Sequence, residues 1–252
     1  MTTRTERWTP GTPCWADVMV ADLEGCRRFY EAVMGWELVS SGGEYGDYYT
    51  ASTGGRAAAG LMPVGEGMPP TWTLYFASDD VDAGAKAVDA NGGTVVMAPT
   101  TIDGIGRMMA AVDPQGAPFG MWQADQFIGA EIYDEPGGLT WEDLRCADIE
   151  AARTFYANVF DFRFDDVDGA EDYQTFSRDD RPLGGIGPQW DAPRTMWIPY
   201  FGTTSTDAAC SAATANGGTV TNQPQDTPWG RIATLEDPDG CRFSIVETPP
   251  TS

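Results

Sequence analysis

Histidine is absent from this chain of 252 residues. Its absence excludes catalytic arrangements of the serine–histidine–aspartate and cysteine–histidine kinds, because both need an imidazole to take the proton of the nucleophile. It also removes a common ligand of zinc, copper and iron. The cysteines are five, an odd number without metal-like spacing, at Cys14, Cys26, Cys146, Cys210 and Cys241. We interpret them as reduced thiols of a cytosolic protein.

Basic side chains are scarce. Fifteen lysine and arginine residues stand against 38 aspartates and glutamates, which gives a formal net charge of −23. Proteins bind nucleic acids largely by neutralising phosphates with lysine and arginine, so we expect no nucleic-acid partner and no anionic membrane partner. A strongly acidic protein instead raises the local concentration of cationic ligands.

Long apolar runs are also missing. No segment approaches the roughly 20 apolar residues needed to span a bilayer. The opening stretch MTTRTERWTPGTP contains no apolar segment of the signal-peptide kind, so we expect a cytoplasmic protein. Large aromatic residues, in contrast, are plentiful, with nine tryptophans, nine tyrosines and eleven phenylalanines. This composition is typical of a globular protein, and the length allows two domains with a core each.

An internal duplication organises the chain. The stretch WADVMVADLEGCRRFYEAVMGWEL, which begins at Trp15, is answered by WEDLRCADIEAARTFYANVFDFRF, which begins at Trp141. Each stretch starts with the alternation of a strand and continues with the apolar spacing of a helix. Asp22 and Asp148 precede the helical parts and are good N-cap residues. The chain therefore uses one strand–helix unit twice.

The repeat extends through the rest of each half. ANGGTV at Ala90 recurs at Ala215, and DPQG at Asp113 is answered by DPDG at Asp237. With the short strands and turns between them, each half has the pattern βαβββ followed by βαβββ. We predict an α+β protein of four βαβββ modules in two tandem eight-stranded domains. The predicted division is an arm at 1–12, a first domain at 13–126, a linker at 127–138, a second domain at 139–248 and a tail at 249–252.

The motifs together resemble those of the vicinal oxygen chelate superfamily. The resemblance lies in the aspartate seven residues before Phe-Tyr, the Asn-Gly-Gly turn and the Asp-Pro-x-Gly turn. This superfamily includes glyoxalase I, the bleomycin-resistance proteins and extradiol dioxygenases. The chain is more particularly similar to two-domain actinobacterial glyoxalase-like proteins and to related proteins of aromatic polyketide pathways. The resemblance implies that each pair of modules curls into a cup with its helices outside.

The resemblance also implies where a metal would bind. Metal-using members place ligands at the start of the first and fifth strands and within the fourth and eighth strands. The matching positions here are Trp15, Thr73 and Gly120 in the first half and Trp141, Ile198 and Ser244 in the second. None of these residues is a good ligand for a divalent cation. We therefore predict no metal and no cofactor.

Strand alternation predicts the lining of the two cups. The residues expected to face inward are Trp15, Asp17, Met19, Thr73, Tyr75 and Trp122 in the first cup, and Trp141, Asp143, Arg145 and Tyr200 in the second. Aromatic walls with few polar groups suit a flat organic ligand, although Trp15 and Trp141 could simply fill the space of a metal. A buried carboxylate is costly unless it is paired. We expect Arg107 or Arg231 to pair with Asp17 and Asp143, or these groups to contact the ligand.

Three functions are compatible with these residues. The first is a metal-independent protein that binds a small aromatic or polycyclic ligand in antibiotic resistance or natural-product tailoring. The second is a metal-free cyclase, isomerase or ring-tailoring enzyme, in which Asp17 or Asp143 acts as general acid or base and Tyr75, Tyr200 or an arginine stabilises an enolate. The third is a metal-dependent lyase or dioxygenase with carboxylate ligands among Glu37, Glu44, Asp47 and Glu247.

The two halves have diverged, which predicts unequal cups. Met19 and Trp122 of the first half are answered by Arg145 and Val246 of the second. We predict one dominant site, in the more aromatic first cup. The linker spans up to about 40 Å when extended, which allows the two halves to pack face to face. The fused chain then contains the pair that other members assemble from two chains, and we expect a monomer or a homodimer.

Overall fold

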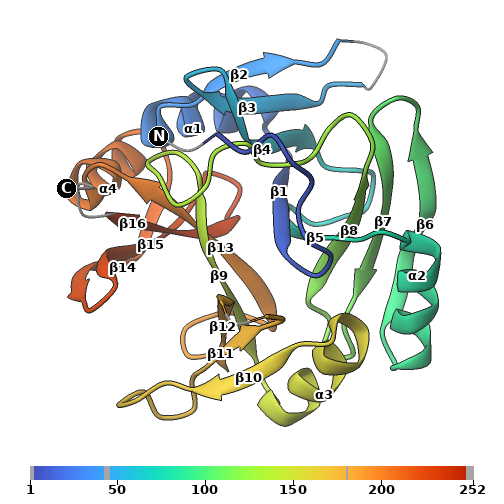
Figure 1. Cartoon of the computed structure of the whole chain (residues 1–252). Coiled ribbons are helices and arrows are strands. Elements are labelled where there is room, and N and C mark those ends of the chain that lie inside the picture. Colours follow the sequence, from blue (N-terminus) through green and yellow to red (C-terminus); the bar gives the residue numbers. More distant parts are fainter. Residues whose placement is uncertain (1–2, 43–45, 180, 248–252) are drawn as a thin grey trace.

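The computed structural model describes residues 3–42, 46–179 and 181–247, so the predicted tail at 249–252 and the candidate ligand Glu44 lie outside the described residues. The chain forms two tandem eight-stranded mixed sheets with helices beside them (Figure 1). The strand order is β2-β3-β4-β1-β5-β8-β7-β6 in the first sheet and β10-β11-β12-β9-β13-β16-β15-β14 in the second. The predicted α+β fold of four βαβββ modules is confirmed.

The elements follow the predicted repeat closely. The first domain comprises β1 (Pro13–Val20), α1 (Leu23–Met34), β2 (Glu37–Ser40), β3 (Tyr49–Thr53), β4 (Arg56–Pro63), β5 (Thr71–Ala77), α2 (Val81–Ala90), β6 (Thr94–Ile102), β7 (Gly106–Val112) and β8 (Pro118–Ala124). The second comprises β9 (Leu139–Cys146), α3 (Ile149–Phe160), β10 (Arg163–Asp166), β11 (Gln174–Ser177), β12 (Pro182–Pro188), β13 (Met196–Thr203), α4 (Thr206–Ala215), β14 (Thr219–Thr227), β15 (Gly230–Glu236) and β16 (Arg242–Glu247).

Local sequence determines where the repeated helices begin and end. The Asp22 carboxylate accepts a hydrogen bond from the Gly25 amide at 2.9 Å, and Asp148 accepts one from Ala151 at 3.0 Å. These bonds satisfy amides that have no partner within a helix. α1 ends at Gly35, whose φ of 67° is left-handed. Its counterpart after α3 is Asp161, which adopts a φ of 62° in spite of its side chain.

The pairing of β1 with β5 creates the first cup. These strands are antiparallel, with Trp15 opposite Tyr75 and Asp17 opposite Thr73, so these residues share one face of the sheet. Ala16 belongs to the other face and to the main core of the molecule. The β9–β13 pair repeats this register in the second cup.

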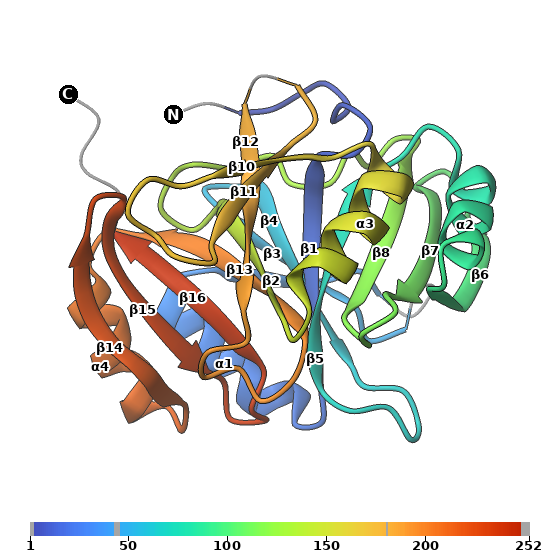
Figure 2. The ribbon, with the colours of Figure 1, turned by 90° about the horizontal axis from the view of Figure 1, so that it is seen from below.

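The main core lies between the two sheets, where α1 and α3 each contact the other domain. Phe29 of α1 packs edge-on against Phe243 of β16, with ring centroids 6.2 Å apart. Phe155 of α3 meets Phe119 of β8 in the same way at 6.0 Å. Figure 2 shows α1 beside the strands of the second sheet and α3 beside β8 of the first. The convex faces of the sheets thus bury each other, and the cups open away from this core.

The repeated motifs pair across the domain interface. Tyr30 donates a hydrogen bond to Asp237 of the second domain at 2.9 Å, and Tyr156 donates one to Asp113 of the first at 3.2 Å. Each domain's Phe-Tyr helix therefore docks on the Asp-Pro-x-Gly turn of the other. The turn after α4 also contacts the other domain. The ring of Phe29 lies so close to Gly218 that a Cβ at this position would overlap it, so only glycine fits.

The predicted arm is an ordered strap in its described part. The Gly11 amide donates to Ala77 of the first domain at 2.8 Å, while Arg178 of the second donates to the Pro10 carbonyl. The arm therefore joins both domains near the linker. In the part of the chain that the structure describes, no helix combines the length and apolar character needed to cross a membrane.

Candidate functional site

The first cup is built around the Asp17 carboxyl group. The Trp15 indole nitrogen donates a hydrogen bond to the Tyr48 hydroxyl at 3.0 Å. The Tyr48 hydroxyl packs directly against the backbone of Gly60 on β4. A Cβ at Gly60 would overlap this hydroxyl and the Cβ of Asp17. The Tyr75 hydroxyl hydrogen-bonds to Asp17. Two phenols and an indole thus surround one carboxyl group.

Asp17 differs from the exposed carboxyl groups of this chain in its burial and in its pKa. Its side chain is 5% exposed, and among the described residues no lysine or arginine forms an ion pair with it. Burial raises the pKa of Asp17 to about 7, although the Tyr75 hydrogen bond favours the ionised form. A carboxyl group with this pKa can give up or accept a proton near neutral pH, as a general acid or base must.

Aromatic side chains close the first cup. Phe127, at the start of the linker, packs edge-on against Trp15 with ring centroids 4.9 Å apart and against Trp122 at 5.9 Å. The Trp122 indole donates to the Phe127 carbonyl at 2.8 Å. A cavity of about 60 Å³ lies at the rim, between Trp122 and Trp8 of the arm. Trp15 and Trp122 are less than 10% exposed, so Phe127 and its neighbours cover the aromatic side of the cup.

The second cup repeats this arrangement and adds a cation. The Trp141 indole donates to Tyr173 at 3.1 Å, and the Tyr173 and Tyr200 hydroxyls donate to Asp143 at 2.8 and 2.7 Å. Arg145 then pairs with the same carboxylate at 2.6 Å. Every oxygen of Asp143 therefore has a partner, and one of the partners is charged.

A loop covers the charged end of the second cup. The Arg145 guanidinium lies 4.2 Å from the ring centroid of Trp190, which follows β12. Trp190 also stacks on Tyr173 at 6.1 Å. Such stacking suits the planar guanidinium and holds Arg145 over Asp143.

The prediction that Arg107 or Arg231 pairs with the cup carboxylates is wrong. Arg107 binds Asp82 at 2.6 Å on the surface, and Arg231 binds Asp207 and Asp226, each at 2.9 Å. Both arginines lie near the outer ends of β7 and β15, where the first residues of α2 and α4 offer carboxylates. Strand alternation predicted that Arg145 faces the second cup. It did not predict that Arg145 pairs with Asp143, two residues earlier on the same strand.

The remaining predicted lining residues do gather in the cups. Trp15, Tyr75 and Trp122 belong to one buried cluster, and Trp141 packs against a second cluster that contains Ile198 and Tyr200. Thr73 is buried beside Asp17, while Met19 is partly exposed at the end of β1.

Neither cup fits the metal that the superfamily often uses. Trp15, Thr73 and Gly120 stand together on β1, β5 and β8, and none of them offers a strong ligand. Within residues 3–42, 46–179 and 181–247, no group of three or more cysteine, aspartate or glutamate side chains is placed to hold a metal ion. The described carboxylates Glu37, Asp47 and Glu247 therefore make no such site.

Sequence reasoning did not identify Phe127, Trp8 and Trp190 as residues of the cups. All three lie outside the regular strands, where strand alternation gives no information on orientation. Tyr48 and Tyr173, which directly precede β3 and the strand β11, place their hydroxyls inside the cups. Their signal was the paired glycines Gly60 and Gly185, which leave room for the phenol rings.

Comparison with known proteins supports one family. The profile of the Glyoxalase/Bleomycin resistance protein/Dioxygenase superfamily matches the chain twice, at residues 14–121 and 138–245. The CFP32 protein of Mycobacterium tuberculosis is 37% identical over 252 residues, which cover 95% of this chain and 96% of that protein. The anthracycline biosynthesis protein DnrV of Streptomyces peucetius is 37% identical over 263 residues, which cover 96% and 94%.

Solved structures show the same architecture at lower identity. The Mn(II)-bound glyoxalase from Novosphingobium aromaticivorans superposes with a TM-score of 0.69 at 18% identity, over 94% of this chain and 82% of that one. This likeness concerns the fold alone.

Proposed function

We propose, from the premise that this chain belongs to the Glyoxalase/Bleomycin resistance protein/Dioxygenase superfamily, that it holds a small aromatic or polycyclic compound in its first cup without the help of a metal ion. The observation that supports this most directly is the lining of that cup, in which Trp15, Tyr75 and Trp122 surround a single carboxyl group. Flat apolar walls with one oriented polar group are typical of sites for planar organic ligands.

The relatives support a role in natural-product chemistry. A protein of anthracycline biosynthesis is 37% identical over nearly the whole chain, and the name of its pathway refers to polycyclic aromatic compounds. We infer a ligand of the same general class, in tailoring or in resistance. Metal independence rests on the residues at the ligand-equivalent positions, and elemental analysis of the purified protein tests it.

Acid–base catalysis is the second candidate, and the state of Asp17 favours it. A carboxyl group whose pKa is about 7 can transfer a proton to or from a phenol or an enol at neutral pH. The hydroxyls of Tyr48 and Tyr75 lie beside it and would stabilise developing negative charge on the ligand oxygen. The cup would then promote a cyclisation, an isomerisation or another ring-tailoring step.

Titration with planar hydroxyanthraquinones, followed by tryptophan fluorescence, tests the binding site. We expect the Trp15→Ala/Trp122→Ala double variant to lose binding, whereas Trp141→Ala, the matched change in the second cup, keeps most of it. Loss in Trp141→Ala alone would place the site in the second cup, and dissociation constants above about 1 mM for every compound would refute the proposal.

Asp17→Asn separates a catalyst from a binder. If Asp17 transfers protons, this variant binds the ligand but loses turnover of a pathway intermediate. Full turnover in Asp17→Asn would remove the assigned acid or base, while Asp143→Asn serves as the matched variant of the second cup.

A further inference from the structure

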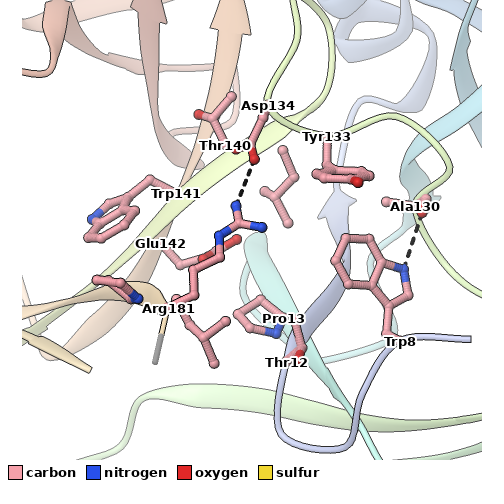
Figure 3. A pocket seen from close by; sticks show the side chains of 13 residues that line it. Trp8, Thr12, Pro13, Ala130, Tyr133, Asp134, Thr140, Trp141, Glu142 and Arg181 are labelled. Carbon is pink, nitrogen blue, oxygen red and sulfur yellow. Dashed lines mark hydrogen bonds and ion pairs between the residues drawn. The ribbon is translucent and has the colours of Figure 1, made fainter. Parts of the chain in front are cut away.

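A cavity of about 50 Å³ lies between the arm, the linker and strands β9 and β12 of the second domain, and Trp141 of the second cup is among its lining residues. Figure 3 shows Trp8 and Tyr133 on one side of it and Glu142 and Arg181 on the other. Thr12, Asp134 and Thr140 add to its polar lining. Three segments far apart in the sequence therefore build one pocket.

Glu142 contributes a buried carboxyl group that lines this cavity. Its side chain lies on the face of β9 opposite to Asp143 and is 4% exposed. Among the described residues, no hydrogen bond or ion pair reaches its carboxyl group. The neighbouring Arg181 pairs with Asp134 instead, at 2.7 Å. A buried carboxyl group without a partner is costly, so a complementary group that enters the cavity would stabilise it.

The aromatic wall of the cavity suits a positive charge. Trp8 and Tyr133 pack edge to face with centroids 5.2 Å apart, and the Trp8 indole is fixed by its hydrogen bond to the Ala130 carbonyl at 3.2 Å. The guanidinium of Arg4 already lies 4.1 Å from the centroid of the Trp8 ring. The ring quadrupole that attracts this cation would also attract a small cation inside the cavity.

We propose that this cavity binds the protonated amine of a small organic molecule, with Glu142 as its counter-ion and Trp8 and Tyr133 beside it. The volume is enough for a few heavy atoms, about the space of two or three waters. A divalent metal is less suited, because Ca²⁺ takes six to eight oxygen ligands and the pocket offers two carboxylates, one of them held by Arg181. The net charge of −23 concentrates cations near the surface.

The charge state of Glu142 links this binding to pH. Burial, then the charges of Asp134 and Asp143, raise the pKa of Glu142 well above its usual range, and Arg181 opposes them. Burial also raises the pKa of the neighbouring Cys14 thiol and keeps it neutral. The raised pKa favours the protonated form of Glu142 in the empty cavity. A bound ammonium group would favour the ionised form, so we expect affinity to rise with pH.

Isothermal titration calorimetry of the full chain with ethylammonium chloride tests the proposal. Sodium chloride at equal ionic strength supplies the baseline. We expect saturable binding to the wild-type protein, at least ten-fold weaker binding to Glu142→Gln, and a change of less than two-fold in Glu150→Gln. The control removes one negative charge from the exposed first turn of α3, so it separates a local effect from the loss of net charge.

Proton release provides an independent readout. Titrations in buffers with different ionisation enthalpies should reveal proton release on ammonium binding in the wild type and none in Glu142→Gln. Because the variant keeps the size of the side chain and removes an unpartnered acid, we expect it to unfold at the same temperature or higher. Equal affinity of the two variants, binding of Ca²⁺ in preference to ethylammonium, or no saturation by 100 mM ethylammonium would each overturn the proposal.

Discussion

The two cups contain the same four side chains around the same point and differ in the residue that follows. Trp15, Tyr48, Asp17 and Tyr75 in the first cup correspond to Trp141, Tyr173, Asp143 and Tyr200 in the second. Two residues beyond the aspartate, the first cup has a methionine and the second has Arg145, which pairs with Asp143 at 2.6 Å.

This one difference changes the chemistry of the cup. In the second cup the Arg145 guanidinium supplies the charge that a buried carboxylate needs, so both oxygens of Asp143 are satisfied by protein groups. In the first cup no cation among the described residues pairs with the buried carboxyl group of Asp17, and burial raises its pKa to about 7. The duplicated scaffold thus holds an ion-paired carboxylate in the second cup and a buried carboxyl group with a raised pKa in the first.

The largest expected effect comes from breaking the second cup. Arg145→Met gives it the residue of the first cup and leaves Asp143 buried without its cation. We expect the free energy of unfolding to fall by about 3 to 5 kcal/mol, because removing one partner of a buried ion pair leaves an uncompensated charge. Urea unfolding measures this. Arg231→Met, which breaks solvent-exposed ion pairs, should lower the free energy of unfolding far less. Equal costs for the two variants would contradict this account of the second cup.

Removing the acid of the first cup should change how stability depends on pH. The ordinary pKa of 3.8 for Asp17 rises to about 7 in the folded protein, so the folded state binds more protons between these values. The contribution of Asp17 is therefore fully present below about pH 4 and is lost as pH rises through 7.

We expect Asp17→Asn to flatten this dependence and to be more stable than the wild type at pH 8, by at most about 4 kcal/mol. Urea unfolding at pH 5 and pH 8 measures the difference. Asp82→Asn removes an exposed carboxylate and should leave the slope nearly unchanged. A wild-type slope that persists in Asp17→Asn would mean that another group causes it.

Converting the first cup into the second tests the comparison directly. Met19→Arg places a guanidinium two residues from Asp17, as Arg145 stands two residues from Asp143, and Met19 is partly exposed, so the longer side chain has room. We expect the pKa of Asp17 to fall by about 1 to 3 units, because a nearby cation favours the ionised form. Carbon-13 NMR of the carboxyl groups measures this. Met19→Gln controls for size, and an unchanged pKa in Met19→Arg would show that the cups differ elsewhere.

The smallest effect concerns the interface, where the two tyrosines differ in one hydrogen bond. Tyr30→Phe and Tyr156→Phe each remove one hydrogen bond across the domains, and Tyr156→Phe also removes the acceptor of the buried Trp197 indole at 2.9 Å. Tyr30→Phe should cost about 1 kcal/mol, since Asp237 keeps its backbone donors. Tyr156→Phe should cost more, because it leaves a buried indole N–H without a partner. Thermal unfolding of both variants measures the difference, and equal costs would contradict this account of the interface.

The sequence by itself determined the fold. The repeated Phe-Tyr helix, the Asn-Gly-Gly turn and the Asp-Pro-x-Gly turn predicted four βαβββ modules, because capping and turn residues act over a few neighbours and need no distant partner. Strand alternation also predicted that Trp15 and Asp17 share a face with Tyr75, since the period of a strand is fixed.

The tertiary structure alone decided which charges meet. Arg107 and Asp82 are 25 residues apart in sequence and yet pair at 2.6 Å. Among the residues that the structure describes, in contrast, no lysine or arginine forms an ion pair with Asp17. Phe127 and Trp8, which cover the first cup, lie in the linker and the arm. The path of these segments depends on how they pack against the two domains. Long-range pairing and the burial of Asp17 arise only when the sheets fold against each other, because burial, and with it the pKa, is a property of the whole surrounding volume rather than of neighbours in sequence.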